Sequence, residues 1–384
     1  MQAQRSLLVQ GWTGINHSYA MVNQYQLLEL AQQPGLSLYS QQMPLFDARW
    51  SANKNNSGFG DDQQKILDSI PAYNQQPLSA IYRIYTPNSL QCEQVRVITF
   101  LVTELGMDAS NFAPNADVQA YQNAGNLIAT PSRWSRERII SYGFRPESVL
   151  VIPHGVDSSK FSPYSPEERL AARQALGYSE DDVVFLNVGA PIWNKGMDLI
   201  IEAFFTVRKT QKNARLLIKD QQSLYGLSAV QMIRDMSGRG TITIDDDSVT
   251  SIRVLPQTLS IGQLRNLYNV ADYYLSPYRA EGFNLPVIEA IASGTPVIVT
   301  AGGSTDDFCD AHTAIQIPST VHRKVVVSNT LVDAYLQPDM SALAEILLRC
   351  SADRARPDHF EFGRVSMLEQ FTWKRAAIMV AALV

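Results

Sequence analysis

The sequence predicts an α/β protein of two domains, each built around a mostly parallel sheet. Short apolar runs alternate along the chain with amphipathic segments of helical period, which is typical of β–α units. The chain has 384 residues, more than a single hydrophobic core usually serves. Several predicted strands also pass through a glycine-containing loop into a predicted helix, as strands of parallel sheets often do.

The first predicted domain, residues 1–160, begins with a strand, a glycine-containing loop and a helix. The loop is Gly11–Ser18, and the helix that follows it is predicted at Tyr19–Leu30. Such a loop brings backbone close to phosphate in many α/β domains, so Gly14 and His17 are candidate binding residues. A structural role is the alternative for His17. The predicted strands of this domain are Ser6–Gln10, Leu36–Tyr39, Ala80–Tyr85, Val95–Thr103 and Leu127–Thr130.

Polar residues mark the end of the first domain. Ser132 is the expected N-cap of a helix. We expect the arginines at 133, 136 and 138 on that helix to face water, with a charged acceptor as the alternative. Ser158–Glu168 is rich in serine, proline and charge, which predicts the linker to the second domain.

The second predicted domain, residues 161–362, repeats the alternation of strands and helices. The run Asp245–Asp247 is expected to form a solvated turn, with metal binding as the minor alternative. Arg349–Pro357 is expected to form a loop before the chain leaves this domain. The predicted strands are Val183–Val188, Leu216–Lys219, Ile252–Leu255, Asp272–Ser276 and Pro296–Val299, and the predicted helices include Met197–Arg208 and Ser260–Ala271.

The stretch Ala280–Thr300 carries the strongest functional pattern. It contains a polar turn, a helix that starts at Pro286 and stops at Gly294, and a further strand. Glu281 lies on the loop before the helix, and Glu289 lies about one turn inside it. Backbone N–H groups at the start of this helix would surround an anion, which the helix macrodipole also favours.

The segment Glu281-Gly-Phe-Asn-Leu-Pro-Val-Ile-Glu289 resembles the paired-glutamate motif of glycosyltransferase family 4, the retaining enzymes of the GT-B fold. Lys195-Gly196 is similar to a second motif of that family, but Ala190 stands where the family usually has an arginine. Val149–Asp157 resembles the segment that closes the family's first domain, and Phe371–Arg375 resembles its closing helix.

The resemblance implies two Rossmann-like domains with parallel sheets that face each other across a cleft, with residues 363–384 returning to the N-terminal domain. It implies transfer of a hexose-type sugar from a nucleotide diphosphate sugar to an acceptor hydroxyl, with retention at the anomeric carbon. The acceptor would be a glycan or a lipid-linked or protein-linked group. No metal or other cofactor is expected.

The resemblance also assigns roles to individual residues. Glu281 would face the reacting carbon, and Lys195 would neutralise the diphosphate. Lys219 could supply the charge that the missing arginine would have carried, since a diphosphate leaving group needs positive charge as its bond breaks. A solvent-exposed lysine is the alternative for Lys219. The predicted donor-binding residues are Glu289, which would bind ribose hydroxyls, together with Gly282, Phe283, Asn284, Leu285, Gly14 and His17.

Composition limits the other classes of function. The net charge of −5 gives no general attraction to nucleic acid, although peripheral membrane contact is compatible with it. We see no signal peptide and no membrane-spanning run, and three widely spaced cysteines fit reduced thiols, so we expect a cytoplasmic protein. The sequence does not predict the oligomeric state. A nucleotide-sugar epimerase, a phosphorylase-like enzyme and a non-catalytic subunit remain alternatives.

Overall fold

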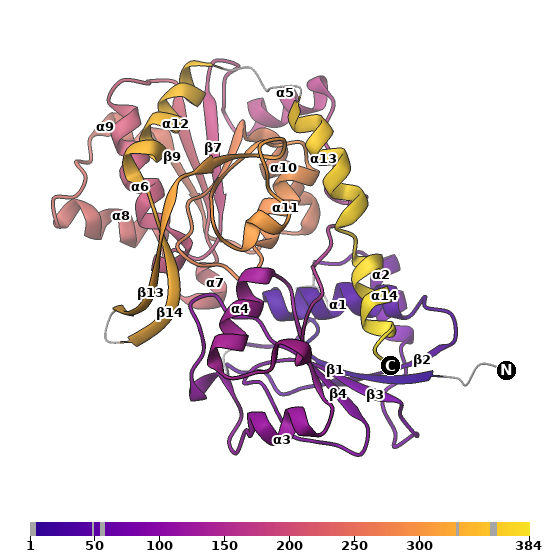
Figure 1. Cartoon of the computed structure of the whole chain (residues 1–384). Helices are drawn as coiled ribbons and strands as arrows, with labels where there is room; N and C mark the ends of the chain where they lie inside the picture. Colours follow the sequence, from indigo (N-terminus) through magenta and orange to yellow (C-terminus); the bar gives the residue numbers. More distant parts are fainter. Residues whose placement is uncertain (1–4, 48–49, 54–57, 328–329, 354–358) are drawn as a thin grey trace. The chain divides into compact units, whose positions relative to one another are not determined.

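The computed structural model describes residues 5–47, 50–53, 58–327, 330–353 and 359–384, which are coloured along the sequence in Figure 1. The chain divides into two compact units, and each is made of separate stretches. Unit 1 comprises Met1–Gly155, Lys324–Ala334 and Gln370–Val384, and unit 2 comprises Val156–Arg323 and Tyr335–Glu369. The sequence placed the main divisions after residues 160 and 362, and it did not foresee the return at 324–334.

Unit 1 contains a six-stranded parallel sheet, with strands in the order β2-β1-β3-β4-β5-β6. All but the last of its strands overlap a predicted strand. Burial explains this agreement, because the inner strands are apolar along almost their whole length. The strands are β1 (Arg5–Gly11), β2 (Leu36–Gln42), β3 (Ala80–Ile84), β4 (Arg96–Phe100), β5 (Leu127–Thr130) and β6 (Val149–Val151).

The helices of unit 1 include one from the far end of the sequence. Tyr25 of the first helix stacks on Trp373 with ring centroids 4.8 Å apart. Gly155 lies so close to the same residue that a Cβ atom there would be 2.0 Å from the backbone nitrogen of Trp373. The return of the chain to the N-terminal unit is therefore tightly packed. The helices are α1 (Ser18–Leu30), α2 (Asp61–Ser69), α3 (Val118–Asn123), α4 (Arg133–Tyr142) and α14 (Trp373–Ala381).

Helix α4 confirms one prediction and corrects another. Ser132 is its N-cap, with its hydroxyl accepting from the backbone N–H of Ser135 at 3.1 Å. Arg138, however, does not face water, because its side chain is 2% exposed. Its guanidinium lies over the ring of Trp134 and pairs with Asp333 at 3.0 Å. The expectation of a solvated arginine was wrong for Arg138, which pairs with the neighbouring Glu137 and also with Asp333, a residue far away in the sequence.

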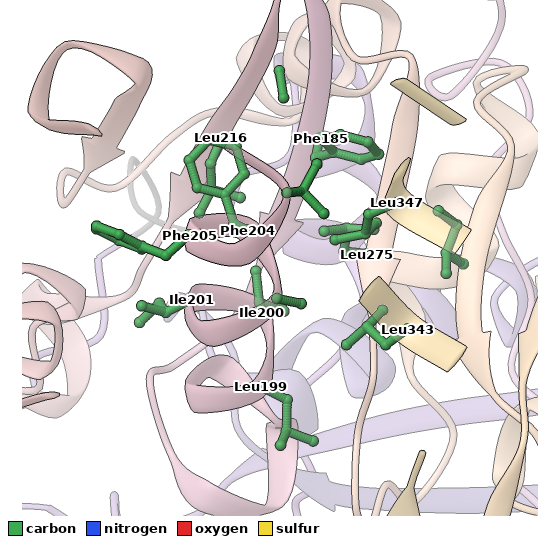
Figure 2. Packing of buried hydrophobic residues seen from close by; sticks show 14 of the residues in the cluster. Phe185, Leu199, Ile200, Ile201, Phe204, Phe205, Leu216, Leu275, Leu343 and Leu347 are labelled. Carbon is green, nitrogen blue, oxygen red and sulfur yellow. The ribbon is translucent and has the colours of Figure 1, made fainter. Parts of the chain in front are cut away.

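Unit 2 contains a second six-stranded parallel sheet, in the order β12-β11-β10-β7-β8-β9. Helix α6 packs on this sheet through Ile200 and Phe204, next to Leu343 and Leu347 of helix α12 (Figure 2). The strands are β7 (Val183–Val188), β8 (Ala214–Lys219), β9 (Ile252–Leu255), β10 (Tyr273–Ser276), β11 (Val297–Thr300) and β12 (Ala314–Ile317).

Three predicted irregular segments of unit 2 are partly helical. Ser165 opens α5 with a capping box, so the helix begins inside the predicted linker. Asp245 is the N-cap of α9 and accepts from the N–H of Ser248 at 2.8 Å, so Asp245–Asp247 begins a helix. The predicted loop from Arg349 is helical as far as Ala352, and residues 354–358 lie outside the described part of the chain. The helices are α5 (Pro166–Ala175), α6 (Met197–Arg208), α7 (Gln222–Tyr225), α8 (Ala229–Gly238), α9 (Asp246–Ser251), α10 (Ile261–Val270), α11 (Leu285–Ala292), α12 (Met340–Ala352) and α13 (His359–Gln370).

A two-stranded sheet, β13 (Ser319–Val327) with β14 (Thr330–Pro338), follows β12 and was not predicted. The backbone N–H of Leu336 in β14 donates to the carbonyl of Arg279 at 2.7 Å. This hydrogen bond places Leu336 beside the chain of unit 2, two residues before Glu281.

Among the described residues, no helix has the length and apolar character needed to cross a membrane.

Candidate functional site

Two loops of unit 2 meet at Gly196. They follow β7 and β10, which are neighbours in the parallel sheet, so their carboxyl ends open on the same edge. Gly196 has a φ of 70°, and a Cβ atom there would be 2.1 Å from the carbonyl oxygen of Pro277. The carbonyl of Asn194 accepts from the N–H groups of Arg279 at 2.7 Å and Ala280 at 3.1 Å. Glycine at 196 thus lets the Lys195 loop and the Glu281 loop touch through their backbones.

The side chain of Arg279 links the same two loops by hydrogen bonds. It is 5% exposed and makes two parallel hydrogen bonds to the carboxylate of Asp198, at 2.8 and 2.7 Å. It also donates to the carbonyl of Trp193 at 2.7 Å, and its guanidinium lies 4.8 Å from that indole ring. A bidentate arginine–carboxylate pair with this much burial holds a fixed geometry. The sequence did not predict a role for Arg279 in this site.

The structure brings Lys195 and Glu281 together, although they are 86 residues apart. The ammonium nitrogen of Lys195 lies 2.5 Å from Oε1 of Glu281, whose side chain is 9% exposed against 29% for the lysine. The stem of Lys195 passes over Gly189, where a Cβ atom would meet Lys195 Cδ at 3.4 Å. Glycine at 189 therefore leaves room for the lysine to reach the glutamate.

The residues after Glu281 form the start of helix α11. Asn284 is the N-cap in a left-handed conformation, with a φ of 79°, and its amide donates to the hydroxyl of Ser276 at 2.8 Å. Phe283 is buried against Phe308, with ring centroids 5.0 Å apart. Leu285 is the first helical residue, one position before the predicted start. The positive end of the helix macrodipole accordingly adjoins the Lys195–Glu281 pair.

Glu289 lies on the inner side of α11 and is only partly exposed. Its Oε2 accepts from the phenol of Tyr268 at 2.8 Å, and burial raises the pKa of the Glu289 carboxyl to about 7. Burial raises the pKa of Tyr274 well above its usual value, and the charges of Glu281 and Glu289 add to this effect. Both carboxylates of the motif therefore act on one buried ring.

Lys219 is not a solvent-exposed lysine, so that alternative is wrong. It is 5% exposed, its ammonium donates to the carbonyl of Asp220, and burial lowers its pKa. Its own carbonyl accepts from the N–H of Gly189 at 3.0 Å, which places its backbone beside the stem of Lys195. The two lysine ammonium groups thus have different partners.

Gly14 and His17 belong to unit 1, whereas the residues of the motif belong to unit 2. Gly14 has a φ of 73°, and its carbonyl accepts from the N–H of Asn53 at 2.7 Å. His17 is the N-cap of α1, with Nδ1 accepting from the N–H of Tyr19 at 3.2 Å. Burial lowers the pKa of His17 to about 4, so the imidazole is neutral at neutral pH. The structure gives this histidine a capping role, and its binding role stays a prediction.

Comparison with known proteins finds a family model that matches part of the chain and relatives that match about half of it or more. Residues 182–337 match the family model described as Glycosyl transferases group 1. The D-inositol 3-phosphate glycosyltransferase of Geodermatophilus obscurus is 32% identical over 193 residues, which are 48% of this chain and 40% of that protein. The mannosylfructose-phosphate synthase of Agrobacterium fabrum is 29% identical over 184 residues, 48% of this chain and 39% of that protein. The chain thus matches these curated relatives over less than half of their length.

Solved structures extend the likeness in fold to nearly the whole chain. A glycosyltransferase from Rickettsia africae superposes with a TM-score of 0.69 at 13% identity, covering 99% of this chain and 97% of that one. The Anabaena protein HepE in complex with UDP and glucose superposes with a TM-score of 0.65 at 14% identity, covering 99% of both chains. At these identities the likeness concerns the fold alone. The chain has the GT-B fold, and its residues 182–337 match the glycosyl transferases group 1 family.

Proposed function

We propose that the chain is a retaining glycosyltransferase that moves a hexose-type sugar from a nucleotide diphosphate sugar to an acceptor hydroxyl without a metal ion. The observation that carries this proposal is the 2.5 Å contact between Lys195 and Glu281 at the start of α11, with Glu289 inside the same helix. The relatives named for sugar transfer to inositol 3-phosphate and for synthesis of a sugar phosphate support it. The HepE complex with UDP and glucose supports a nucleotide sugar as donor.

Lys195 and Glu281 have separate roles in the proposed reaction. The bond between the anomeric carbon and the phosphate oxygen breaks while the acceptor oxygen bonds to the same carbon. Lys195 and the start of α11 stabilise the charge that grows on the diphosphate. Glu281 stabilises the positive charge that develops on the sugar, and the departing phosphate oxygen takes the proton of the acceptor. Lys195 reaches the leaving group by exchanging part of its contact with Glu281 for a phosphate oxygen.

We place this enzyme in the cytoplasm. Cys92, Cys309 and Cys350 are free thiols, and the two latter are buried. Free thiols in a chain of this kind fit a reducing compartment.

A screen of nucleotide sugars tests the proposed reaction. We expect the protein to hydrolyse one donor slowly to nucleoside diphosphate and free sugar, and to transfer that sugar when an acceptor is added. Proton NMR of the first product should show the anomeric configuration of the donor. Glu281→Gln should remove both activities while leaving the protein folded.

The other outcomes of the same screen identify the alternatives. A free epimer of the donor indicates an epimerase, and a product that forms only with inorganic phosphate indicates a phosphorylase. Absence of turnover with nucleotide still bound indicates a non-catalytic subunit, for which the alanine at 190 would be a reason. An inverted product overturns the retaining assignment.

Metal independence is a separate expectation. If Lys195 and the start of α11 neutralise the diphosphate, treatment with EDTA should leave the rate of transfer unchanged. The measurement is the initial rate before and after chelation, with manganese or magnesium added back. A rate that falls with EDTA and returns with either metal would overturn this part of the proposal.

Nucleotide binding should depend on the ionisation of Glu289. Its carboxyl has a pKa of about 7, so it is mostly protonated below that pH and mostly ionised above it. Only the ionised form can accept hydrogen bonds from two ribose hydroxyls with both oxygens. We therefore expect the affinity for a nucleoside diphosphate to rise by up to roughly tenfold as pH rises through the pKa of Glu289.

Calorimetry with Glu289→Gln provides the control for this pH dependence. The variant lacks the titrating group, so the nucleotide's own ionisation is the same for both proteins and only the difference reports Glu289. We expect weaker binding and a shallower pH profile for the variant. Equal affinity of both proteins for every nucleotide, at every pH, would exclude Glu289 from the ribose site.

A further inference from the structure

A basic groove lies in unit 2, at the opposite end of the strands from Lys195. It has a volume of about 590 Å³ and is lined by residues of β9 and by the chain around Tyr178. Arg215, which lines it, is the second residue of β8, whereas Lys219 is the last. At about 3.3 Å per residue, the groove lies roughly 13 Å from the carboxyl end of that strand. It is therefore separate from the proposed nucleotide-sugar site.

The side chains that line the groove favour an anion. They include three arginines and one carboxylate, although the whole chain has a net charge of −5. Thr250, Ser251 and Tyr178 also line it. The charged residues are Arg208, Arg215, Arg253 and Asp247.

The three guanidinium groups are fixed in place by other contacts. Arg208 is 4% exposed and pairs with Asp247 at 2.5 Å, while its buried Nε atom has no hydrogen-bond partner among the described residues. Arg215 pairs with Asp182 at 2.8 Å. Arg253 donates to the carbonyl of Leu176 at 2.7 Å. Arg208 also donates to the carbonyls of Gln211 and Lys212, and Arg215 to that of Lys212, so the N–H donors that remain belong mainly to Arg253.

Arg253 provides the most accessible of these groups. It is exposed, and its guanidinium carbon lies 5.9 Å from the centroid of the Tyr178 ring. Planar guanidinium groups bind phosphate oxygens in pairs, which is why arginine is the usual residue at phosphate sites. A volume of about 590 Å³ lies within the range of small-molecule sites and exceeds the size of a bare phosphate ion.

We propose that this groove binds a phosphate-bearing small molecule at a site distinct from that of the nucleotide sugar. The proposal rests on the geometry of the groove and does not depend on the proposed sugar transfer. Inorganic phosphate is the minimal probe for it, since it carries the charged part of the ligand.

The test is a calorimetric titration of the whole protein with inorganic phosphate at constant ionic strength. We expect saturable binding to the wild type and to Lys195→Ala. Arg253→Gln should bind phosphate about tenfold more weakly or worse, because it loses charge-assisted hydrogen bonds. Arg253→Lys keeps the charge without the planar fork and should fall between the two.

Arg234→Gln is the matched control, because it removes the same charge from an exposed position on α8 outside the groove. It should bind phosphate as the wild type does. Absence of saturable binding to the wild type overturns the proposal, as does equal binding by Arg253→Gln and the wild type. Binding that Lys195→Ala abolishes and Arg253→Gln preserves also overturns it, because the phosphate would then occupy the proposed diphosphate site.

Discussion

Lys195→Ala is expected to lower kcat by on the order of 10²-fold or more, the scale seen when one electrostatic stabiliser of a transition state is removed. The reason is that Lys195 contacts the motif glutamate, while alanine stands at 190, where the family that the sequence resembles usually has an arginine. Lys195→Arg, which keeps the charge, should retain more activity. The measurement is kcat for sugar transfer, with the melting temperature recorded for each variant.

Substitutions of two further lysines provide a control and a second test. Lys209→Ala removes an exposed lysine at the end of α6 and should leave kcat unchanged. Lys219→Ala tests whether a second cation acts on the diphosphate, and we expect it to lower kcat on the same scale. It should also lower the melting temperature, because Lys219 is 5% exposed. Normal turnover of a destabilised Lys219→Ala would restrict this residue to a structural role, and normal turnover of Lys195→Ala would remove the basis of the proposed mechanism.

Gly196→Ala is expected to destabilise unit 2 and to disrupt the Lys195–Glu281 contact. A side chain in the left-handed conformation costs about 1–2 kcal/mol by itself. The added Cβ atom would also lie 2.1 Å from the carbonyl oxygen of Pro277, so one of the two loops must move. We expect the free energy of unfolding to fall by more than about 2 kcal/mol, measured by denaturant titration.

Gly177→Ala separates the two causes of that loss. Gly177 also belongs to unit 2 and has a φ of 76°, but nothing lies within 4 Å of the Cβ atom it lacks. Its substitution should therefore show the conformational cost without the collision, and kcat should not change. Equal destabilisation by the two substitutions would mean that the approach of Gly196 to Pro277 is unimportant for stability.

The sequence predicted much of the sheet architecture because buried parallel strands are apolar along their length. Leu127–Thr130 and Val183–Val188 begin and end where expected. The start of α11 was predictable to within one residue because Pro286 suits the first turn of a helix. Patterns of this kind depend only on neighbouring residues.

The contacts that hold the Lys195 loop to the Glu281 loop were not predictable, because they join residues far apart in the chain. Arg279 and Asp198 are 81 residues apart, and nothing in either local sequence marks the pair. The β13–β14 sheet escaped prediction although β13 has four valines among its nine residues and Ser-Asn stands between the two strands. Every residue of β13 is exposed or intermediate, so this strand lacked the continuous apolar run that marked the other strands.

The packing of α14 on α1 has a consequence for the order in which the parts of the protein can fold. Arg5 donates to the carbonyl of Ala381 at 2.7 Å, and Tyr25 stacks on Trp373, so partners of the first strand and helix are synthesised more than 340 residues later. A nascent chain of 155 residues holds all six strands of the first sheet, but it lacks the helix that covers Tyr25. N-terminal domains commonly fold first during translation, but this unit can be completed only after residues 370–384 have been synthesised.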